Sequence, residues 1–397
     1  MRILYASHRP PYPFFLGGAA RCAHRLLLAL AEDHGVACAA VGWLGYGVTP
    51  WAMPPSQDYA ALGVRGVSGS SGPKPDHDTL LNCGYPIRLL GDFTTELPRL
   101  LAQNRPDIVW TQLEGAREIL GLARKQNVQG LLYVHDAEDD PRELRAAADL
   151  GCHIVCSSEF LAREVALATG RSTHAVYPAS DWYFGIAGDM DGCVTMINPH
   201  AVKGLDTFFE IARRMPAQHF LLQESWKLND SALAALQGRL ATLANVTFQH
   251  RVSDMRQVYR RTKVLLIPSI WEEGFGMVAV EAQSCGIPVI ASARGGLPES
   301  VGDGGMLIDA YRDVDAWTTA LTRLLADPEA YARWSARALA HARTDSFTPR
   351  QLALRFLEAC RAPPPRLDLR YRVKRMLADG ISRVPVLRRA ARLRSLS

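Results

Sequence analysis

The stretch PSIWEEGFGMVAVEA at residues 268–282 has the pattern of a buried strand that ends in a turn and continues into a helix. Ligands of open α/β sheets bind at such junctions, beside the carboxyl ends of strands and the N-termini of helices. Unpaired backbone N–H groups and the helix dipole favour phosphate there. Gly274 and Gly276 would let the backbone approach a ligand closely. Glu273 stands at the mouth of the turn, and Glu281 lies about two helical turns further on.

The parts of this stretch are weak evidence when taken one at a time. Pairs of glutamates at this spacing occur by chance in many chains, and Gly-Phe-Gly is common in tight turns. The residues that follow strengthen the pattern, because a second apolar run ends at Ser292 and leads to a second glycine pair, Gly295 and Gly296. Together these features predict two strand ends at which backbone amides meet an anion.

Short apolar runs alternate with amphipathic helical stretches along most of the chain. The runs predict two sets of strands, at residues 2–7, 36–43, 107–112, 130–135 and 153–157 and at residues 194–197, 220–223, 246–249, 264–268, 288–292 and 306–309. Helices are expected between them at residues 22–32, 116–125, 141–149, 159–169, 205–214, 231–243 and 277–285, and again from 314 to 360. This alternation predicts an α/β fold of parallel sheets with helices on both faces.

The alternation pauses near residues 178–191 and then restarts, which suggests a division of the chain. We expect a first Rossmann-like domain at residues 1–185, a second at residues 186–350, and a C-terminal helix with a basic tail at residues 351–397. Residues 45–91 interrupt the first domain with a Gly-, Pro- and Ser-rich segment of weak periodicity, which we interpret as long loops.

The composition is that of a soluble globular protein, with 397 residues of which 48% are hydrophobic and 21% charged. No apolar stretch reaches the ~20 residues that a membrane-spanning helix needs. The eight cysteines are scattered and match no common zinc or redox spacing, so we expect buried free thiols. These features lead us to expect a cytoplasmic protein.

Positive charge is concentrated in residues 361–397, which contain eleven Lys and Arg and two Asp. Basic segments that also carry Leu, Val and Met can lie on anionic membranes, which would place the protein at the inner face of a membrane. The alternative is a solvated tail that packs partly on the first domain. No nucleic-acid-binding fold accompanies the charge, so we expect no nucleic-acid partner.

The spacing of Glu273 and Glu281, with Gly-Phe-Gly after the first, resembles the signature of glycosyltransferase family 4 (group 1). Members are retaining enzymes of the GT-B fold, in which two Rossmann-like doubly wound domains face a central cleft. The resemblance implies that Glu273 and the amides of Phe275, Gly276 and Met277 contact the donor sugar. It implies that Glu281 binds the ribose of the nucleotide.

Other motifs are similar to those of the same family. Gly17 and Gly18, after the first strand, resemble its glycine pair beside the donor diphosphate. His135, at the end of a first-domain strand, resembles its histidine close to the reacting sugar, and Lys203 resembles its diphosphate-binding lysine. Apart from the family, His135 is equally consistent with a hydrogen-bonded core histidine and Lys203 with a solvated lysine that opens a helix.

The sequence departs from the family at Asn198. Members commonly carry an arginine five or six residues before the lysine, as a second positive partner of the diphosphate, but Ile197 and Asn198 stand at these positions. Asn198 can donate hydrogen bonds but carries no charge. Either Arg251 or Arg294 compensates from a neighbouring loop, or donor binding is weaker, or the activity differs.

The resemblance implies a hexosyltransferase that uses a nucleotide-sugar as its substrate and needs no other cofactor. No Asp-x-Asp motif stands at a strand end, so we expect chemistry without a metal. The acceptor is a hydroxyl, in our leading hypothesis on a surface polysaccharide or its lipid-linked precursor. A secondary-metabolite acceptor, an epimerase or phosphorylase reaction, and a nucleotide-sugar-binding protein without catalysis are the alternatives.

Overall fold

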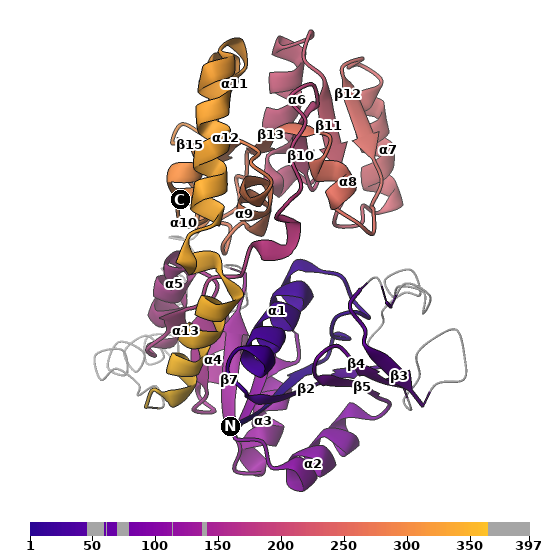
Figure 1. The fold of residues 1–397 in the computed structure, drawn as a ribbon, viewed down its shortest axis with the longest axis vertical. Helices are drawn as coiled ribbons and strands as arrows, with labels where there is room; N and C mark the ends of the chain where they lie inside the picture. The colour runs from indigo at the N-terminus through magenta and orange to yellow at the C-terminus, as the bar shows by residue number, and fades with distance from the viewer. Residues whose placement is uncertain (46–58, 61, 70–78, 113, 137–140, 364–397) are drawn as a thin grey trace, which may run out of the picture.

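The chain folds into two α/β units, each built on its own sheet, that lie one above the other (Figure 1). The computed structural model describes residues 1–45, 59–60, 62–69, 79–112, 114–136 and 141–363. The proposed membrane-contacting tail therefore lies almost wholly outside the described residues. None of the helices in the described residues is long and apolar enough to cross a membrane.

The first sheet has nine strands in the order β3-β4-β5-β2-β1-β6-β7-β8-β9. In this order every neighbouring pair from β5-β2 to β8-β9 is parallel, whereas β3-β4 and β4-β5 are antiparallel. The strands are β1 (Arg2–Ser7), β2 (Ala37–Trp43), β3 (Gly66–Ser68), β4 (Leu80–Asn82), β5 (Pro86–Leu90), β6 (Ile108–Gln112), β7 (Gln129–Val134), β8 (His153–Cys156) and β9 (His174–Ala175).

Helices cover both faces of the first sheet because successive side chains of its buried strands point to opposite sides. Ile3 and Tyr5 of β1 pack on the side of α1, while Leu4 and Ala6 pack on the other. One face carries α1 (Gly18–Glu32) and the C-terminal helix α13 (Pro349–Arg361). The opposite face carries α2 (Phe93–Asn104), α3 (Ala116–Lys125), α4 (Pro141–Ala148) and α5 (Glu159–Thr169).

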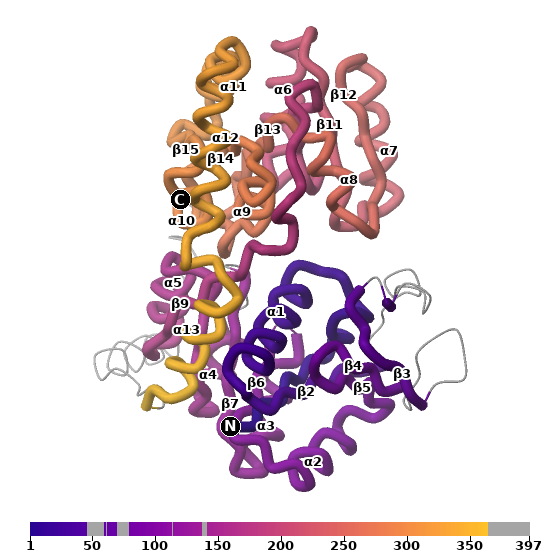
Figure 2. The backbone as a smooth tube through the Cα atoms, viewed as in Figure 1, coloured from indigo at the N-terminus to yellow at the C-terminus, as the bar shows by residue number. Residues whose placement is uncertain are grey.

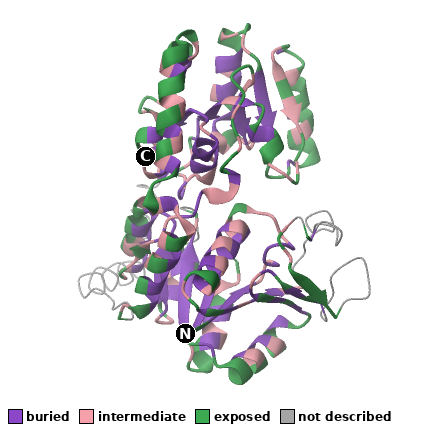
Figure 3. Cartoon of the chain, viewed as in Figure 1, coloured by how far each residue is buried: buried purple, intermediate pink, exposed green. Residues whose placement is uncertain are grey.

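The second sheet is parallel throughout, in the order β12-β11-β10-β13-β14-β15. Its strands are β10 (Cys193–Ile197), β11 (Phe220–Gln223), β12 (Val246–Gln249), β13 (Thr262–Ile267), β14 (Val289–Ser292) and β15 (Gly305–Ile308). One face packs against α6 (Leu205–Arg214), α7 (Asp230–Leu240), α11 (Val314–Ala326) and α12 (Pro328–Ala342). The other packs against α8 (Arg256–Tyr259), α9 (Met277–Ser284) and α10 (Leu297–Val301). Both sheets are buried along their centres (Figure 3).

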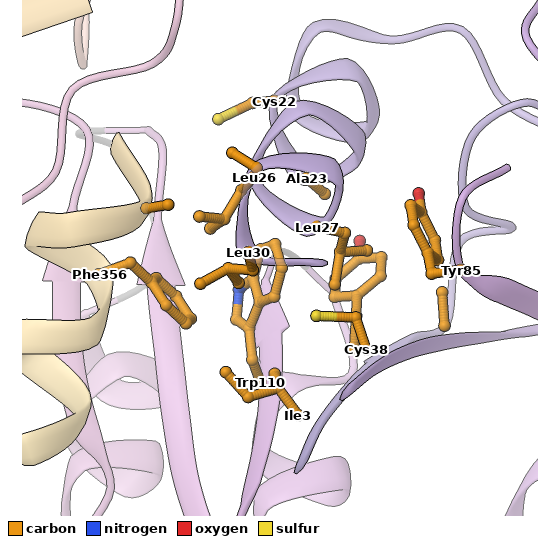
Figure 4. Packing of buried hydrophobic residues seen from close by; sticks show 14 of the residues in the cluster. Ile3, Cys22, Ala23, Leu26, Leu27, Leu30, Cys38, Tyr85, Trp110 and Phe356 are labelled. Carbon is orange, nitrogen blue, oxygen red and sulfur yellow. The ribbon is translucent and has the colours of Figure 1, made fainter. Parts of the chain in front are cut away.

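The chain crosses between the two units twice. It passes up through the short helix η3 (Asp181–Tyr183), and after α12 it runs back down to place α13 beside α1 (Figure 2). Phe356 of α13 is fully buried, with its ring centroid 5.1 Å from that of Trp110 on β6, next to α1 (Figure 4). The last described helix is therefore part of the core of the first unit.

The expected alternation of parallel strands and helices is confirmed, with bounds that differ by a few residues. The interpretation of residues 45–91 as loops alone is wrong within the described residues, because β3, β4 and β5 lie there. Strand β5 pairs with β2 and buries Ile87, Leu89 and Leu90. Three to five residues are too few to show periodicity when Gly- and Pro-rich sequence surrounds them. All eight cysteines are free, and all but Cys193 are buried, as expected.

We expect Phe356→Ala to lower the free energy of unfolding by about 3–5 kcal/mol, because it removes a fully buried ring and leaves a cavity against Trp110. Urea denaturation followed by circular dichroism measures this loss. Leu354→Ala, on the same helix but 36% exposed, is the matched control and should change stability little. Equal effects of the two variants would contradict the docking of α13.

Candidate active site between the two sheets

The turn after β13 touches the end of β7 across the boundary between the two units. A Cβ atom on Gly274 would lie 1.9 Å from the carbonyl oxygen of His135 and 3.5 Å from the Cα atom of Asp136. Only glycine therefore fits at this position. Ser158, at the N-terminus of α5, is completely buried and donates a hydrogen bond from Oγ to the carbonyl oxygen of Gly274. The predicted His135 and Glu273 regions are thus brought together.

A second contact between the units lies beside the first. The carboxylate of Glu299 on α10 accepts hydrogen bonds from the backbone N–H groups of Glu159 and Phe160, at 2.7 and 2.6 Å. N–H groups in the first turn of a helix have no partner within the helix, so Glu299 satisfies two of them in α5. Its carboxylate also complements the positive end of the helix dipole. Both contacts hold the turns after β13 and β14 against the carboxyl ends of β7 and β8.

Lys203 and Glu273 form a nearly buried ion pair at this place. Lys203 ends the short helix η4 (Ala201–Lys203) after β10, and its Nζ lies 2.8 Å from both carboxylate oxygens of Glu273. The side chains are 11% and 12% exposed, and Ser269 Oγ donates to Glu273 Oε1 at 2.8 Å. Lys203 is therefore not a solvated lysine. An anion that reaches this pair finds an ammonium group already held in position.

His135 is a neutral imidazole in a fixed orientation. Its Nε2 lies 2.8 Å from Gln112 Oε1, while Gln112 Nε2 donates to Tyr5 Oη at 2.8 Å. This network assigns the proton of His135 to Nε2. The ring stacks on Tyr133 with centroids 4.2 Å apart, and burial lowers the pKa of His135 to about 4. His135 is thus held by its hydrogen bond to Gln112 and also lies at the contact with the Gly274 turn.

Asp136 is an acidic neighbour of the Lys203–Glu273 pair and was not among the predicted site residues. Burial raises the pKa of its carboxyl group, the charge of Lys203 lowers it, and that of Glu273 raises it again. Its place directly after His135 was the only signal in the sequence.

The N-termini of α1 and α9 meet at the same place. A Cβ atom on Gly18, the first residue of α1, would lie 3.6 Å from Met277 Sδ, in ordinary contact. Gly276 precedes α9 with φ of 85°, a conformation that residues other than glycine seldom adopt. Gly17 precedes α1, and Phe275 is buried. The backbone N–H groups that begin α1 and α9 therefore lie close together, and α9 begins four residues after Glu273 in the chain.

Glu281 is buried inside α9 rather than exposed beside Glu273, which precedes the helix. Its side chain accepts a 2.6 Å hydrogen bond from Tyr259 Oη, and the residue is 8% exposed. Burial raises the pKa of Glu281, while the Tyr259 hydrogen bond and the charge of Arg21 lower it. Arg21 belongs to α1 and donates to Tyr183 Oη, so the first unit supplies a cation near this carboxylate.

Asn198 makes a structural hydrogen bond. It has φ of 69°, and its Oδ1 accepts from the backbone N–H of Trp226 at 2.7 Å. Of the two arginines considered as replacements for the missing charge, Arg294 pairs with Glu272 at 3.2 Å and packs over Tyr311. Arg251 donates its backbone N–H to Glu224.

Two tryptophans beside Lys203 were also missed. The Nζ atom of Lys203 lies 4.6 Å from the ring centroid of Trp226 and 5.7 Å from that of Trp271. Nothing in the local sequence pattern links Trp226 to a lysine more than twenty residues away. Within the described ranges, no group of three or more His, Cys, Asp or Glu side chains is arranged to hold a metal ion.

Sequence comparison relates the second unit to known proteins. Residues 201–341, which include Lys203, Glu273 and Glu281, match the family model Glycosyl transferases group 1. D-inositol 3-phosphate glycosyltransferase of Mycobacterium avium (strain 104) is 44% identical over 168 residues, 40% of this chain and 39% of that protein. The enzyme of the same name from Rhodococcus opacus (strain B4) is 41% identical over 120 residues, 29% of this chain and 26% of that protein. The chain thus spans well under half the length of these curated relatives.

Structural comparison covers nearly the whole chain. HepE of Anabaena in complex with UDP-glucose has a TM-score of 0.69 at 16% identity, over 90% of this chain and 98% of that one. Sucrose-phosphate synthase from Thermosynechococcus elongatus has a TM-score of 0.67 at 18% identity, over 90% and 97%. At these identities the likeness concerns the fold.

The expected fold class and the resemblance of the second unit are therefore confirmed. The chain has the GT-B fold of glycosyltransferases, and residues 201–341 match glycosyl transferases group 1.

Proposed function

We propose that this protein is a glycosyltransferase that moves a sugar from a nucleotide-sugar donor to an acceptor hydroxyl, with retention of the anomeric configuration. The observation that carries the proposal is the Lys203–Glu273 pair, held where the carboxyl ends of both sheets meet and beside two helix N-termini. The group 1 match over residues 201–341 supports it. So does the UDP-glucose complex of a structural neighbour, although only by analogy of fold.

The donor diphosphate would bind at Lys203 and the free amides of α1 and α9. Cleavage of the anomeric bond leaves negative charge on the nucleoside diphosphate, and fixed donors aimed at that charge lower the barrier. When phosphate oxygens replace Glu273 as the partner of Lys203, the carboxylate of Glu273 becomes available to accept hydrogen bonds from sugar hydroxyls. The ion pair would thus exchange partners as the donor binds.

Neutral His135 suits a place beside the reacting sugar, because an imidazole can hydrogen-bond hydroxyls without opposing the positive character of the sugar in the transition state. Gln112 fixes its proton on Nε2. In a retaining reaction of this kind the acceptor attacks on the face that the diphosphate leaves, and a phosphate oxygen takes the acceptor proton. The contact of the Gly274 turn with His135 would exclude water and limit hydrolysis.

The acceptor supplies the hydroxyl group that receives the sugar. A hydroxyl of a surface polysaccharide or its lipid-linked precursor, reached by contact of the basic tail with a membrane, is our first candidate. The names of the curated relatives add a small phosphorylated polyol, and a secondary metabolite is a further candidate.

We propose that the reaction needs no metal and no cofactor beyond the donor itself. Equal activity with and without EDTA would support this.

The test is a panel of UDP-, GDP-, ADP- and dTDP-sugars, with binding followed by calorimetry and slow hydrolysis by chromatography. We expect one donor to bind selectively, and Glu281→Ala to abolish that binding because the ribose loses its carboxylate. Tight binding without transfer to any acceptor would favour the non-catalytic alternative. A folded protein that binds none of the four donors would contradict the proposal.

Lys203→Met should weaken binding of the selected donor and slow its hydrolysis by roughly 100-fold or more, because a preorganised cation is lost from the leaving group. Lys125→Met, an exposed lysine on α3, is the matched control and should behave as the unmodified protein. Thermal melting of both variants separates loss of binding from loss of folding. Unchanged donor binding in Lys203→Met would remove Lys203 from the site.

Glu281→Gln should raise the melting temperature at pH 7, because the neutral amide removes a charge that burial disfavours. Burial raises the pKa of Glu281 above its ordinary 4.5, so the folded state binds the proton more tightly and stability falls as the pH rises through that window. The gain should therefore shrink toward pH 4.5, as calorimetry from pH 5 to 8 would show. Exposed Glu164→Gln serves as control, and a lower melting temperature for Glu281→Gln at pH 7 would contradict the buried charge.

A further inference from the structure

Trp226 presents an exposed indole beside an almost buried ion pair. Its residue is 47% exposed, yet its ring centroid lies 4.6 Å from Lys203 Nζ and 5.4 Å from the ring of His200. An uncovered indole leaves a large apolar surface in water, at a cost in free energy that a bound partner would recover. Its position next to the predicted phosphate-binding lysine indicates what that partner is.

The backbone of Trp226 is held by Asn198. Oδ1 of Asn198 accepts the N–H of Trp226 at 2.7 Å. Asn198 is itself fixed at the end of β10, in a left-handed conformation, with its own N–H donated to the carbonyl oxygen of Gln223. The residue that replaces the expected arginine therefore positions the tryptophan.

The loop that carries Trp226 is fixed at its other end as well. The carboxylate of Glu224, which is 6% exposed, accepts the backbone N–H groups of Leu228 at 2.9 Å and Arg251 at 3.2 Å. Leu228 is buried in the core of the second unit. The indole is thus presented by a rigid loop after β11, tied to the loop after β12. A face that is ordered before the ligand arrives loses little entropy when it binds.

We propose that Trp226 is the stacking face for the nucleobase of the donor, and that Asn198 serves to hold it there. This inference rests on the proposed nucleotide-sugar donor. Lys203 follows β10 and marks the diphosphate, and Glu273 reaches it from the neighbouring strand β13, where the sugar would lie. Trp226 reaches Lys203 from β11, the neighbour of β10 on the other side, where the nucleoside end would lie. Every nucleobase has a π face that can stack on an indole.

The proposal gives the departure at Asn198 a positive role. An arginine at this position would strengthen binding through charge on the diphosphate. Asn198 instead strengthens it through an aromatic surface that its side chain keeps in place. Affinity for the nucleobase should then depend on residues 198 and 226 together, and affinity for the bare diphosphate should not depend on residue 226.

Calorimetry on the full chain tests this with UDP, GDP, ADP, dTDP and inorganic pyrophosphate. For the nucleoside diphosphate that binds the unmodified protein best, we expect Trp226→Leu to weaken binding about tenfold, because base–aromatic stacking is lost. Trp226→Phe should keep most of the affinity. Pyrophosphate should bind all three proteins equally. Trp334→Leu, which removes another indole that lies under an arginine, is the matched control and should leave the binding of every ligand unchanged.

The outcomes separate the two levels of the argument. If no nucleoside diphosphate binds the unmodified protein, the proposed function fails and this inference fails with it. If a nucleoside diphosphate binds and Trp226→Leu binds it equally well, only the stacking is overturned. The stacking is also overturned if Trp226→Leu weakens pyrophosphate binding to the same extent, because Trp226 would then act on Lys203. It is overturned as well if only binding of the intact nucleotide-sugar is weakened, because the sugar would then be the stacked group.

Asn198→Gly tests the anchoring role, because glycine tolerates the left-handed backbone and removes only the side-chain acceptor. We expect it to weaken nucleoside diphosphate binding to the extent that Trp226→Leu does, with little further loss in the double variant. Residues that act as one unit show such non-additivity. Fully additive losses would show that Asn198 contacts the ligand by itself and would overturn the anchoring.

Discussion

The approach of the Gly274 turn to the carbonyl group of His135 is the contact on which the rest of the site depends. It brings the carboxyl ends of two separate sheets to one place, and it tolerates no side chain at residue 274. The hydrogen bond from Ser158 and the cap that Glu299 supplies to α5 maintain the same approach. Without it, the parts of the site would face open solvent on two unrelated sheets.

Charge is kept inside this contact at a cost in stability. Lys203 and Glu273 neutralise each other, so neither charge is buried alone. Removal of one partner from such a pair costs more stability than formation of the pair contributes. Glu281 accepts a hydrogen bond from the hydroxyl of Tyr259 and lies in the field of Arg21, and burial raises its pKa. Charges held in unfavourable surroundings are characteristic of sites that bind ligands, where the ligand completes the electrostatics.

Asn198 has a structural role at the position where an arginine was expected. A neutral side chain there frees its oxygen to bind the backbone of Trp226, and that loop then places an indole beside Lys203. Arg294, considered as a replacement cation, is engaged by Glu272 and Tyr311 instead.

The α/β class, most strands and helices, and the turn at residues 273–276 could be predicted from the sequence, because buried parallel strands and their helices have strong local patterns. The sequence analysis missed β3 to β5, short strands that join the sheet through the pairing of β5 with β2. The pairing of Lys203 with Glu273, the burial of Glu281 under Tyr259 and the place of Trp226 beside the pair could not be predicted from the sequence. Such contacts join residues far apart in the chain, and they are set by strand order and by the approach of the two sheets, which no local pattern encodes.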